Sequence, residues 1–352
     1  MTQDAPLRHA IHSLSQGLDL TAEATAAAFD VVMRGEATPV QTSALLMGLR
    51  AKGETADEVA GAATALRSAM VRFDAQGDGM VDTCGTGGGR VGTINISTAA
   101  AFIVAGAGVP VAKHGNRSYT SRSGSADVLE ALGVDITLGP ERASGVLRDT
   151  GIVFLFAPTY HPAMRHVAAV RKELGVATIM NLLGPLANPA GVQRQVIGVA
   201  TEDRAPLVAS ALARLGATHA LVVHAAVGMD EVSPSGRTNV WEVRDGAVAR
   251  WEVLPAALGL ECDDLDGLAG GEPEENARRV EQLLEGRGAR AERCAVLLNA
   301  AAALYVSGRG WTLEEAVAHA RDSLERGAAL RALAALRAAA PKATSAAAST
   351  CG

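Results

Sequence analysis

The sequence predicts an α/β protein built from a small all-helical domain and a large domain whose mostly parallel central sheet is flanked by helices. Residues 1–70 carry only helical patterns, whereas short apolar runs alternate with helical segments from about residue 79. Such alternation is typical of a parallel sheet with helices on both faces. The length of 352 residues agrees with one large or two modest domains.

Helix signals in the first 70 residues are specific. Thr38 and Pro39 place a capping residue and a proline at a helix start, and Gly53 ends that helix. Thr55 and Glu58 form a capping box ahead of apolar residues at helical spacing. We therefore expect a helical domain over residues 1–75, joined by a middle stretch near 165–185. The α/β domain is expected to span 76–340, and residues 341–352 are small and polar, so we expect a disordered tail.

The α/β part is predicted element by element from its apolar runs. Expected strands begin at Met80 and cover 109–113, 153–156, 195–200 and 220–224, with a hairpin over 238–253 around Asp245 and Gly246. Expected helices cover 97–105, 125–132 and several segments within 274–338, where Thr312 and Glu315 form another capping box. Ligands of such sheets sit at the carboxyl ends of the strands.

Composition excludes several classes of protein. The net charge of −6 and the aromatic content of 3% argue against a nucleic-acid-binding surface. The four cysteines form no CxxC pair, so a zinc ribbon is excluded and reduced thiols are expected. Apolar runs are too short to cross a bilayer, and the N-terminus lacks a signal-peptide core. We therefore expect a cytoplasmic protein with no nucleic-acid or membrane partner.

A glycine-rich loop follows the first expected strand, in the segment DTCGTGGGRVGTINIST at 82–98. Its glycines let backbone amides approach an anion closely, and Asn95, Ser97 and Thr98 stand where a helix begins. No Lys-Ser or Lys-Thr follows the glycines, so this is not a Walker A loop. Gly87, Gly89 and Gly92 match GxGxxG, which is weak evidence alone.

A second polar cluster follows the next strand. Lys113, His114, Asn116 and Arg117 are followed by several hydroxyl side chains, among them Ser125. Because a buried strand leads into these two cations, Lys113 and Arg117, we expect a negatively charged ligand at that end of the strand. With the glycine loop, the cluster predicts a pocket for a polyphosphate.

These motifs in their order resemble the anthranilate phosphoribosyltransferases. The resemblance rests on GTGG, NIST, KHGNR, SGSAD, LFAPTYHPAMRH, VRKELG, NLLGPLANP and GMDEVS, which run from about residue 80 to 235. It implies transfer of the 5-phosphoribosyl group from phosphoribosyl pyrophosphate to the amine of anthranilate, with release of pyrophosphate, in tryptophan biosynthesis. It also implies two Mg²⁺ ions and a homodimer formed through the helical domain.

The resemblance assigns roles position by position. Lys113 and Arg117 would stabilise charge in catalysis, with no covalent nucleophile; Cys84 is interpreted as an apolar filler. Mg²⁺ would be held by Ser97, Asp230 and Glu231. Phosphoribosyl pyrophosphate would contact Gly85, Gly88, Gly89, Thr93, Asn95, Ser97, Thr98, Lys113, His114, Gly115, Asn116, Arg117, Ser121 and Ser125. Anthranilate would contact Gly85, Asn116, Arg171, His114, Pro158, Tyr160 and His161, with Met164 near its entry channel.

One departure concerns Gly89, because the family usually reads GTGGD. The missing carboxylate would lie near the diphosphate and its metal, so we expect an active enzyme with altered magnesium dependence.

Two alternative functions stay open at this point. A pyrimidine nucleoside phosphorylase has a similar two-domain fold, but it would lack the Asp-Glu loop at 230–231. A non-catalytic, nucleic-acid-binding relative would be basic and degraded at the phosphate motifs, whereas this chain is acidic and keeps nearly all of them.

Overall fold

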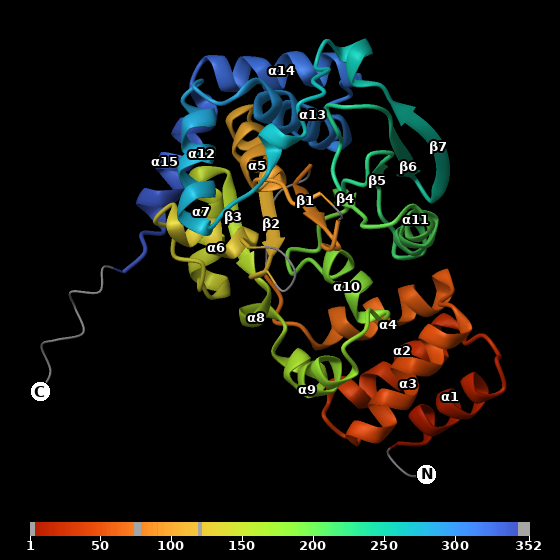
Figure 1. Cartoon of the computed structure of the whole chain (residues 1–352). Helices are drawn as coiled ribbons and strands as arrows, with labels where there is room; N and C mark the ends of the chain where they lie inside the picture. Colours follow the sequence, from red (N-terminus) through yellow and green to blue (C-terminus); the bar gives the residue numbers. More distant parts are fainter. Residues whose placement is uncertain (1–3, 74–78, 90, 119–121, 344–352) are drawn as a thin grey trace, which may run out of the picture.

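A computed structural model of the chain describes residues 4–73, 79–89, 91–118 and 122–343. A helical lobe lies below a larger α/β lobe (Figure 1), which confirms the predicted fold class. Of the expected C-terminal tail, residues 344–352 lie outside the described residues. Within the described ranges, no helix combines the length and apolarity needed to cross a bilayer.

The helical lobe begins with four helices whose ends follow the predicted signals. They are α1 (Ala5–Ser15), α2 (Ala22–Met33), α3 (Pro39–Lys52) and α4 (Ala56–Ala69). Capping boxes at Thr38 and Thr55 start α3 and α4, and Gly53 ends α3 with a φ of 91°. A later helix, α9 (Arg165–Leu174), packs on α2 and α3, and its Val167 and Val170 belong to the same buried core. The lobe therefore draws on two separate stretches of the chain.

Seven strands form one sheet in the order β3-β2-β1-β4-β5-β6-β7. The first five are parallel, and β6 and β7 form an antiparallel hairpin, as predicted, whose turn residue Asp245 has a φ of 49°. The strands are β1 (Val81–Gly85), β2 (Val111–Gly115), β3 (Ile152–Phe156), β4 (Arg194–Gly198), β5 (His219–Ala225), β6 (Thr238–Arg244) and β7 (Ala247–Val253).

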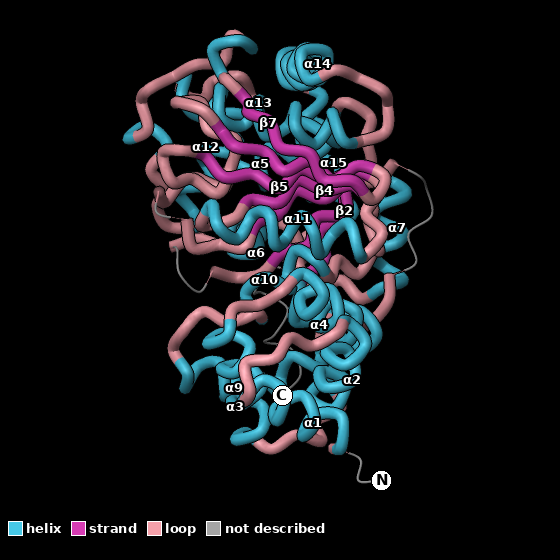
Figure 2. The backbone as a smooth tube through the Cα atoms, turned by 90° about the vertical axis from the view of Figure 1, so that its right-hand side faces the viewer, coloured by secondary structure: helices cyan, strands magenta, loops and turns pink. Residues whose placement is uncertain are grey.

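Helices cover both faces of the sheet (Figure 2). One face carries a core shared with α5 (Ile96–Gly106), α12 (Pro273–Leu284), α13 (Arg290–Val306), α14 (Leu313–Glu325) and α15 (Ala328–Ala339). The other face packs on α11 (Ala205–Arg214), which also contacts α4, so one buried core joins the helical lobe to the sheet. Shorter helices α6 (Ser125–Ala131), α7 (Pro140–Thr150), α8 (Ala157–Tyr160) and α10 (Met180–Leu186) complete the fold.

Strand β1 lies at the point where the sheet order reverses. From β1 the chain crosses to β2 on one side, and β4 later enters on the other side. Loops that leave β1 and β4 at their carboxyl ends therefore diverge and open a crevice, which is where parallel sheets bind ligands. The glycine loop leaves β1 at this crevice.

Candidate active site

The glycine loop lies against the end of β4. The Thr86 amide donates to the Gly198 carbonyl at 2.9 Å, and a Cβ built on Gly85 would lie 3.2 Å from the same oxygen. Gly87 and Gly88 have φ values of 68° and 84°, a region that L side chains rarely adopt. Glycine is thus required both for the close approach and for the turn.

Helix α5 begins beside this loop and is held there by long-range bonds. The Nδ2 of the Asn95 side chain donates to the Ser123 carbonyl at 3.2 Å, and the Nδ2 of Asn276 in α12 donates to the Asn95 Oδ1 at 2.9 Å. Ser97 and Thr98 stand in the first turn, where the positive end of the helix dipole favours an anion. The Thr98 hydroxyl is buried and has no hydrogen-bond partner among the described residues.

Lys113 is buried at the end of β2 and reaches across β1. Its Nζ donates to the Thr83 carbonyl and lies 3.3 Å from the Ser97 hydroxyl at the start of α5. Burial lowers the pKa of Lys113, whereas the nearby Asp82 and Glu231 carboxylates oppose that change. The side chain thus brings a cation to the start of α5.

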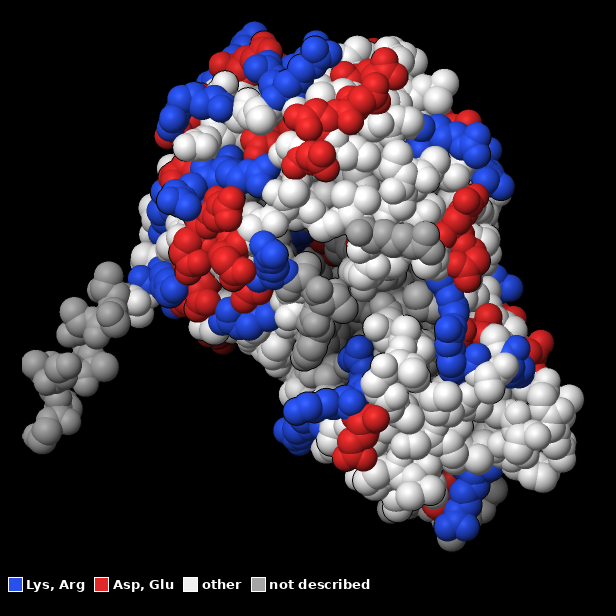
Figure 3. Space-filling model, in the orientation of Figure 1, with Lys and Arg blue, Asp and Glu red and all other residues white. Residues whose placement is uncertain are grey.

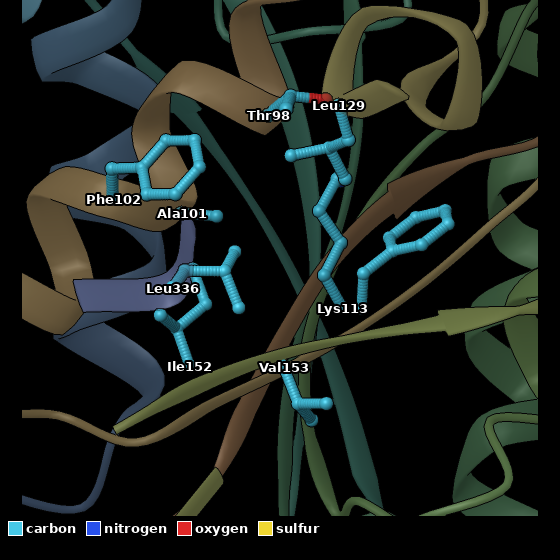
Figure 4. A pocket seen from close by; sticks show the side chains of 9 residues that line it. Thr98, Ala101, Phe102, Lys113, Leu129, Ile152, Val153 and Leu336 are labelled. Carbon is cyan, nitrogen blue, oxygen red and sulfur yellow. The ribbon is translucent and has the colours of Figure 1, made fainter. Parts of the chain in front are cut away.

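A void of about 10 Å³ lies beneath Lys113, with room for one water molecule at most. Figure 4 shows the Lys113 stem and Thr98 among apolar side chains around it. Because the void is small and almost wholly apolar, it is a packing defect and no ligand site. Figure 3 shows instead that the protein surface is hollowed between the two lobes.

Arg117 lies at the exposed rim of the second polar loop. Its Nη1 contacts Asp127 at 2.7 Å and Glu130 at 3.0 Å, and its guanidinium stands 5.8 Å from the Phe156 ring centroid. The hydrogen bonds that Arg117 donates to Glu130 and then to Asp127 raise the pKa of Arg117. The structure therefore brings Lys113 to the helix start and places Arg117 on two carboxylates of α6.

The rest of that loop is tightly packed. A Cβ on Gly115 would run into the Ser125 hydroxyl and lie 2.7 Å from the Phe154 ring. Asn116 accepts the Arg117 amide at 2.8 Å with its side chain and the Ser125 hydroxyl at 3.4 Å with its carbonyl. Predicted residue Ser121 lies outside the described residues, and Thr93 forms an antiparallel bridge with Ala269.

His114 and His161 form a buried pair beneath the loop. Their ring centroids are 5.0 Å apart, and the Nδ1 of His114 lies 3.2 Å from the Gly184 carbonyl. Burial first, and then the neighbouring His161, lowers the pKa of His114 to about 3, and burial lowers that of His161 to about 4. Both imidazoles are therefore neutral at physiological pH.

The other residues predicted to bind the acceptor lie in three environments. Tyr160 is fully buried, and its hydroxyl donates to the Leu138 carbonyl at 3.0 Å. Pro158 is exposed, and Met164 is half-buried. Arg171 is half-buried in the last turn of α9, so it is carried by the helical lobe. The residues predicted to bind phosphoribosyl pyrophosphate, in contrast, belong to the α/β lobe.

Asp230 and Glu231 follow β5; Asp230 reaches the glycine loop, and Glu231 accepts a hydrogen bond from the Ser97 amide. A Cβ on Gly89 would lie 3.0 Å from the Asp230 Cγ, and one on Gly198 would collide with the Asp230 carbonyl oxygen. Burial and then the neighbouring Asp230 raise the pKa of Glu231 to about 8, although Lys113 and the Ser97 amide oppose the rise. Burial also raises the pKa of Asp230. Two crowded carboxylates beside a hydroxyl suit a hard cation such as Mg²⁺.

The sequence reading missed Asp82, which organises this edge. Its side chain is 0 % exposed and accepts the His114 amide at 3.2 Å and the Asn188 side-chain amide at 2.8 Å. Asn188 also donates to the Ala112 carbonyl at 2.8 Å. A carboxylate inside a buried strand was the available signal, since such a group needs partners.

Comparison with known proteins identifies relatives over nearly the whole chain. Residues 77–330 match the model of the glycosyl transferase family a/b domain, and residues 8–70 match that of the helical bundle domain of the same family. The anthranilate phosphoribosyltransferase of Rubrobacter xylanophilus is 50% identical over 327 residues, which cover 93% of this chain and 95% of that protein. The one from Anaeromyxobacter dehalogenans is 50% identical over 323 residues, which cover 92% and 95%.

Solved structures of anthranilate phosphoribosyltransferases also align with this chain over nearly its whole length. The crystal structure of anthranilate phosphoribosyltransferase from Thermus thermophilus aligns with a TM-score of 0.88 and 43% identity, over 93% of this chain and 99% of that one. The enzyme from Saccharomyces cerevisiae, in complex with phosphoribosyl pyrophosphate and Mg, aligns with a TM-score of 0.88 and 30% identity, over 96% and 98%.

Proposed function

The chain belongs to the anthranilate phosphoribosyltransferase family of glycosyl transferases, and we propose that its crevice binds both substrates of that reaction. The enzyme transfers the 5-phosphoribosyl group of phosphoribosyl pyrophosphate to the amine of anthranilate and releases pyrophosphate. The observation that carries the assignment is the set of anion-binding groups at one sheet edge: the glycine loop, the start of α5 and buried Lys113.

Phosphoribosyl pyrophosphate would bind at this edge. The amides of the glycine loop and of the first turn of α5 would hold its diphosphate. Lys113 would place its ammonium against the leaving group, since its Nζ already lies beside the Ser97 hydroxyl. Asn116 and Ser125 would line the ribose phosphate side. Arg117 would first have to leave Asp127 and Glu130 to contribute its charge.

Magnesium would be held by Asp230, Glu231 and the Ser97 hydroxyl. These oxygen donors fit the ion. Burial first, and then the neighbouring Asp230, raises the pKa of Glu231 to about 8, and a bound cation would favour its charged form. Within the described residues, no group of three His, Cys, Asp or Glu side chains forms a metal site. Phosphate oxygens would therefore complete the coordination, and we propose two ions. When bound, Mg²⁺ neutralises charge on the diphosphate.

Anthranilate would enter from the side of the helical lobe. We propose that Arg171 faces its carboxylate and that Gly85, Asn116 and the neutral His114 and His161 lie near its ring. An aromatic amine is unprotonated at neutral pH, so no general base is needed before it attacks C1. Both histidines, neutral at that pH, would serve as uncharged walls. Catalysis would depend on positioning and on charge stabilisation at the leaving group.

Domain limits, assembly and location are part of the proposal. We propose a helical domain of residues 1–75 with the stretch near 165–185, an α/β domain of 76–340, and a homodimer formed through the helical domain. The exposed apolar side chains Leu18 and Val40 on that domain support a contact surface there. Free thiols at Cys84, Cys262 and Cys294 support a cytoplasmic location.

A product assay tests the proposed function. Incubation with anthranilate, phosphoribosyl pyrophosphate and Mg²⁺ should give N-(5-phosphoribosyl)anthranilate by mass spectrometry, together with an equal amount of pyrophosphate. Parallel incubation of uridine or thymidine with phosphate should give no ribose 1-phosphate or deoxyribose 1-phosphate. Phosphorolysis of a nucleoside without phosphoribosyl transfer would reject the proposal in favour of a nucleoside phosphorylase.

A further inference from the structure

A second large cleft lies away from the phosphate-binding edge. It has a volume of about 740 Å³, within the range of small-molecule sites. Its walls are the second half of α4, residues 70–73, the loop 189–191 and the end of α11. The loop and the end of α11 lead into β4 and β5, whereas the phosphate-binding residues follow the carboxyl ends of strands. The cleft therefore shares no residue with the site described above.

Three arginines line this cleft, and their charges are only partly balanced. The Nε of Arg214 contacts the Asp57 carboxylate at 2.5 Å. The Nε of Arg67 donates to the Leu186 carbonyl at 2.6 Å, and no carboxylate of the described chain pairs with Arg67 or Arg72. Burial lowers the pKa of Arg67, because a buried guanidinium is poorly solvated. Among the described residues, one carboxylate faces these three guanidinium groups, and two of the positive charges have no paired carboxylate there.

The rest of the lining suits a carbon skeleton. Met70, Phe73, Pro189 and Leu215 contribute apolar surface between the arginines. A site that combines apolar walls with a few fixed charges binds organic ions better than inorganic ones. Planar guanidinium groups favour carboxylate and phosphate oxygens.

We propose that this cleft is a binding site for a small organic dianion, a dicarboxylate or a phosphate ester, held by Arg67 and Arg72 with Arg214 at its margin. The two arginines that pair with no carboxylate of the described chain match a doubly charged ligand, and the apolar walls accept its carbon chain. Its walls come from α4 of the helical lobe and from α11 and the 189–191 loop of the α/β lobe. A bound dianion therefore bridges the two lobes.

Succinate is a suitable probe because it carries two charges on a short carbon chain. Binding is measured by calorimetry with saturating phosphoribosyl pyrophosphate and Mg²⁺, which occupy the phosphate-binding edge. Propionate serves as a singly charged control. We expect saturable succinate binding and at least tenfold weaker propionate binding. Hydrogen exchange should show protection in residues 64–73 and 186–191.

Variants make the test specific. Arg72 is exposed and forms no bond to the described chain, so Arg72→Glu should fold normally and bind succinate at least tenfold more weakly. Arg148→Gln, at an exposed arginine on α7, should bind like the wild type. Equal succinate binding in Arg72→Glu and wild type, or binding that does not saturate at millimolar concentration, would overturn the proposal. Protection confined to residues 85–98 would also overturn it, because the ligand would then occupy the phosphate edge.

Discussion

Replacement of Gly89 with aspartate should shift the magnesium dependence of the enzyme. In the structure, the place of a side chain at position 89 is taken by Asp230, whose Cγ lies 3.0 Å from a Cβ built there. A carboxylate at position 89 would therefore face the Asp230 carboxylate at close range. Because Asp230 is expected to bind Mg²⁺, the cation would relieve the repulsion and bind the variant more tightly.

The size of this effect follows from the geometry. Two unit charges about 4 Å apart repel by roughly 4 kcal/mol at an effective dielectric constant of about 20. Gly89 is partly exposed, so solvent screening reduces the repulsion to about 1–2 kcal/mol. Since about 1.4 kcal/mol corresponds to a tenfold change in affinity, the half-saturating Mg²⁺ concentration should fall about tenfold.

The assay is a magnesium titration of the initial rate at saturating anthranilate and phosphoribosyl pyrophosphate. Gly89→Asn is the matched control, because its side chain has the same shape without the charge. It should leave the half-saturating concentration near that of the wild type. Superimposable curves for Gly89→Asp and wild type would refute the reasoning, and so would equal shifts in both variants.

The remaining predictions concern the buried charges and the acceptor site. Lys113→Met should abolish transfer and lower the urea unfolding free energy by about 3–5 kcal/mol, because the buried Asp82 carboxylate keeps its hydrogen bonds but loses its nearby cation. Asp82→Asn added to Lys113→Met should restore stability without turnover, and restored turnover would contradict the role of Lys113. The pKa values of His114 and His161 are lowered in the folded state, so the stability that these neutral histidines contribute above pH 6.5 is lost as the pH falls. Between pH 7 and 5 the unfolding free energy should fall by about 2 kcal/mol for each histidine. Urea titrations in which His114→Asn keeps the full pH dependence would contradict this. Arg171→Lys should raise the KM for anthranilate about tenfold and leave that for phosphoribosyl pyrophosphate unchanged; a fall in kcat alone would argue against carboxylate binding.

Local chemistry made much of the fold predictable. Thr38, Thr55 and Thr312 all start helices in capping boxes, because the short-range bonds of a cap depend on residues three apart. Asp245 and Gly246 form the predicted hairpin turn, because such a turn needs positive φ values and an Asp-Gly pair adopts them readily. The glycine loop and the start of α5 were equally predictable, since the glycines and the polar residues at the helix start stand together in the sequence. That they bind phosphate stays a prediction.

Long-range pairing could not be predicted from such local patterns. Arg117 forms ion pairs with Asp127 and Glu130, because it lies close to these two carboxylates of α6 in the folded chain. Asn276 donates a hydrogen bond to Asn95, although its helix, α12, begins 178 residues after Asn95 in the sequence. The arginine-lined cleft likewise depends on how α4 and α11 pack, which no sequence motif specifies.

Anthranilate fluorescence measures the central claim most directly. With excess phosphoribosyl pyrophosphate and Mg²⁺, the fluorescence should disappear at a rate proportional to enzyme concentration. Omission of either phosphoribosyl pyrophosphate or Mg²⁺ should leave it unchanged. A folded protein that leaves anthranilate fluorescence constant at every Mg²⁺ concentration would contradict the account.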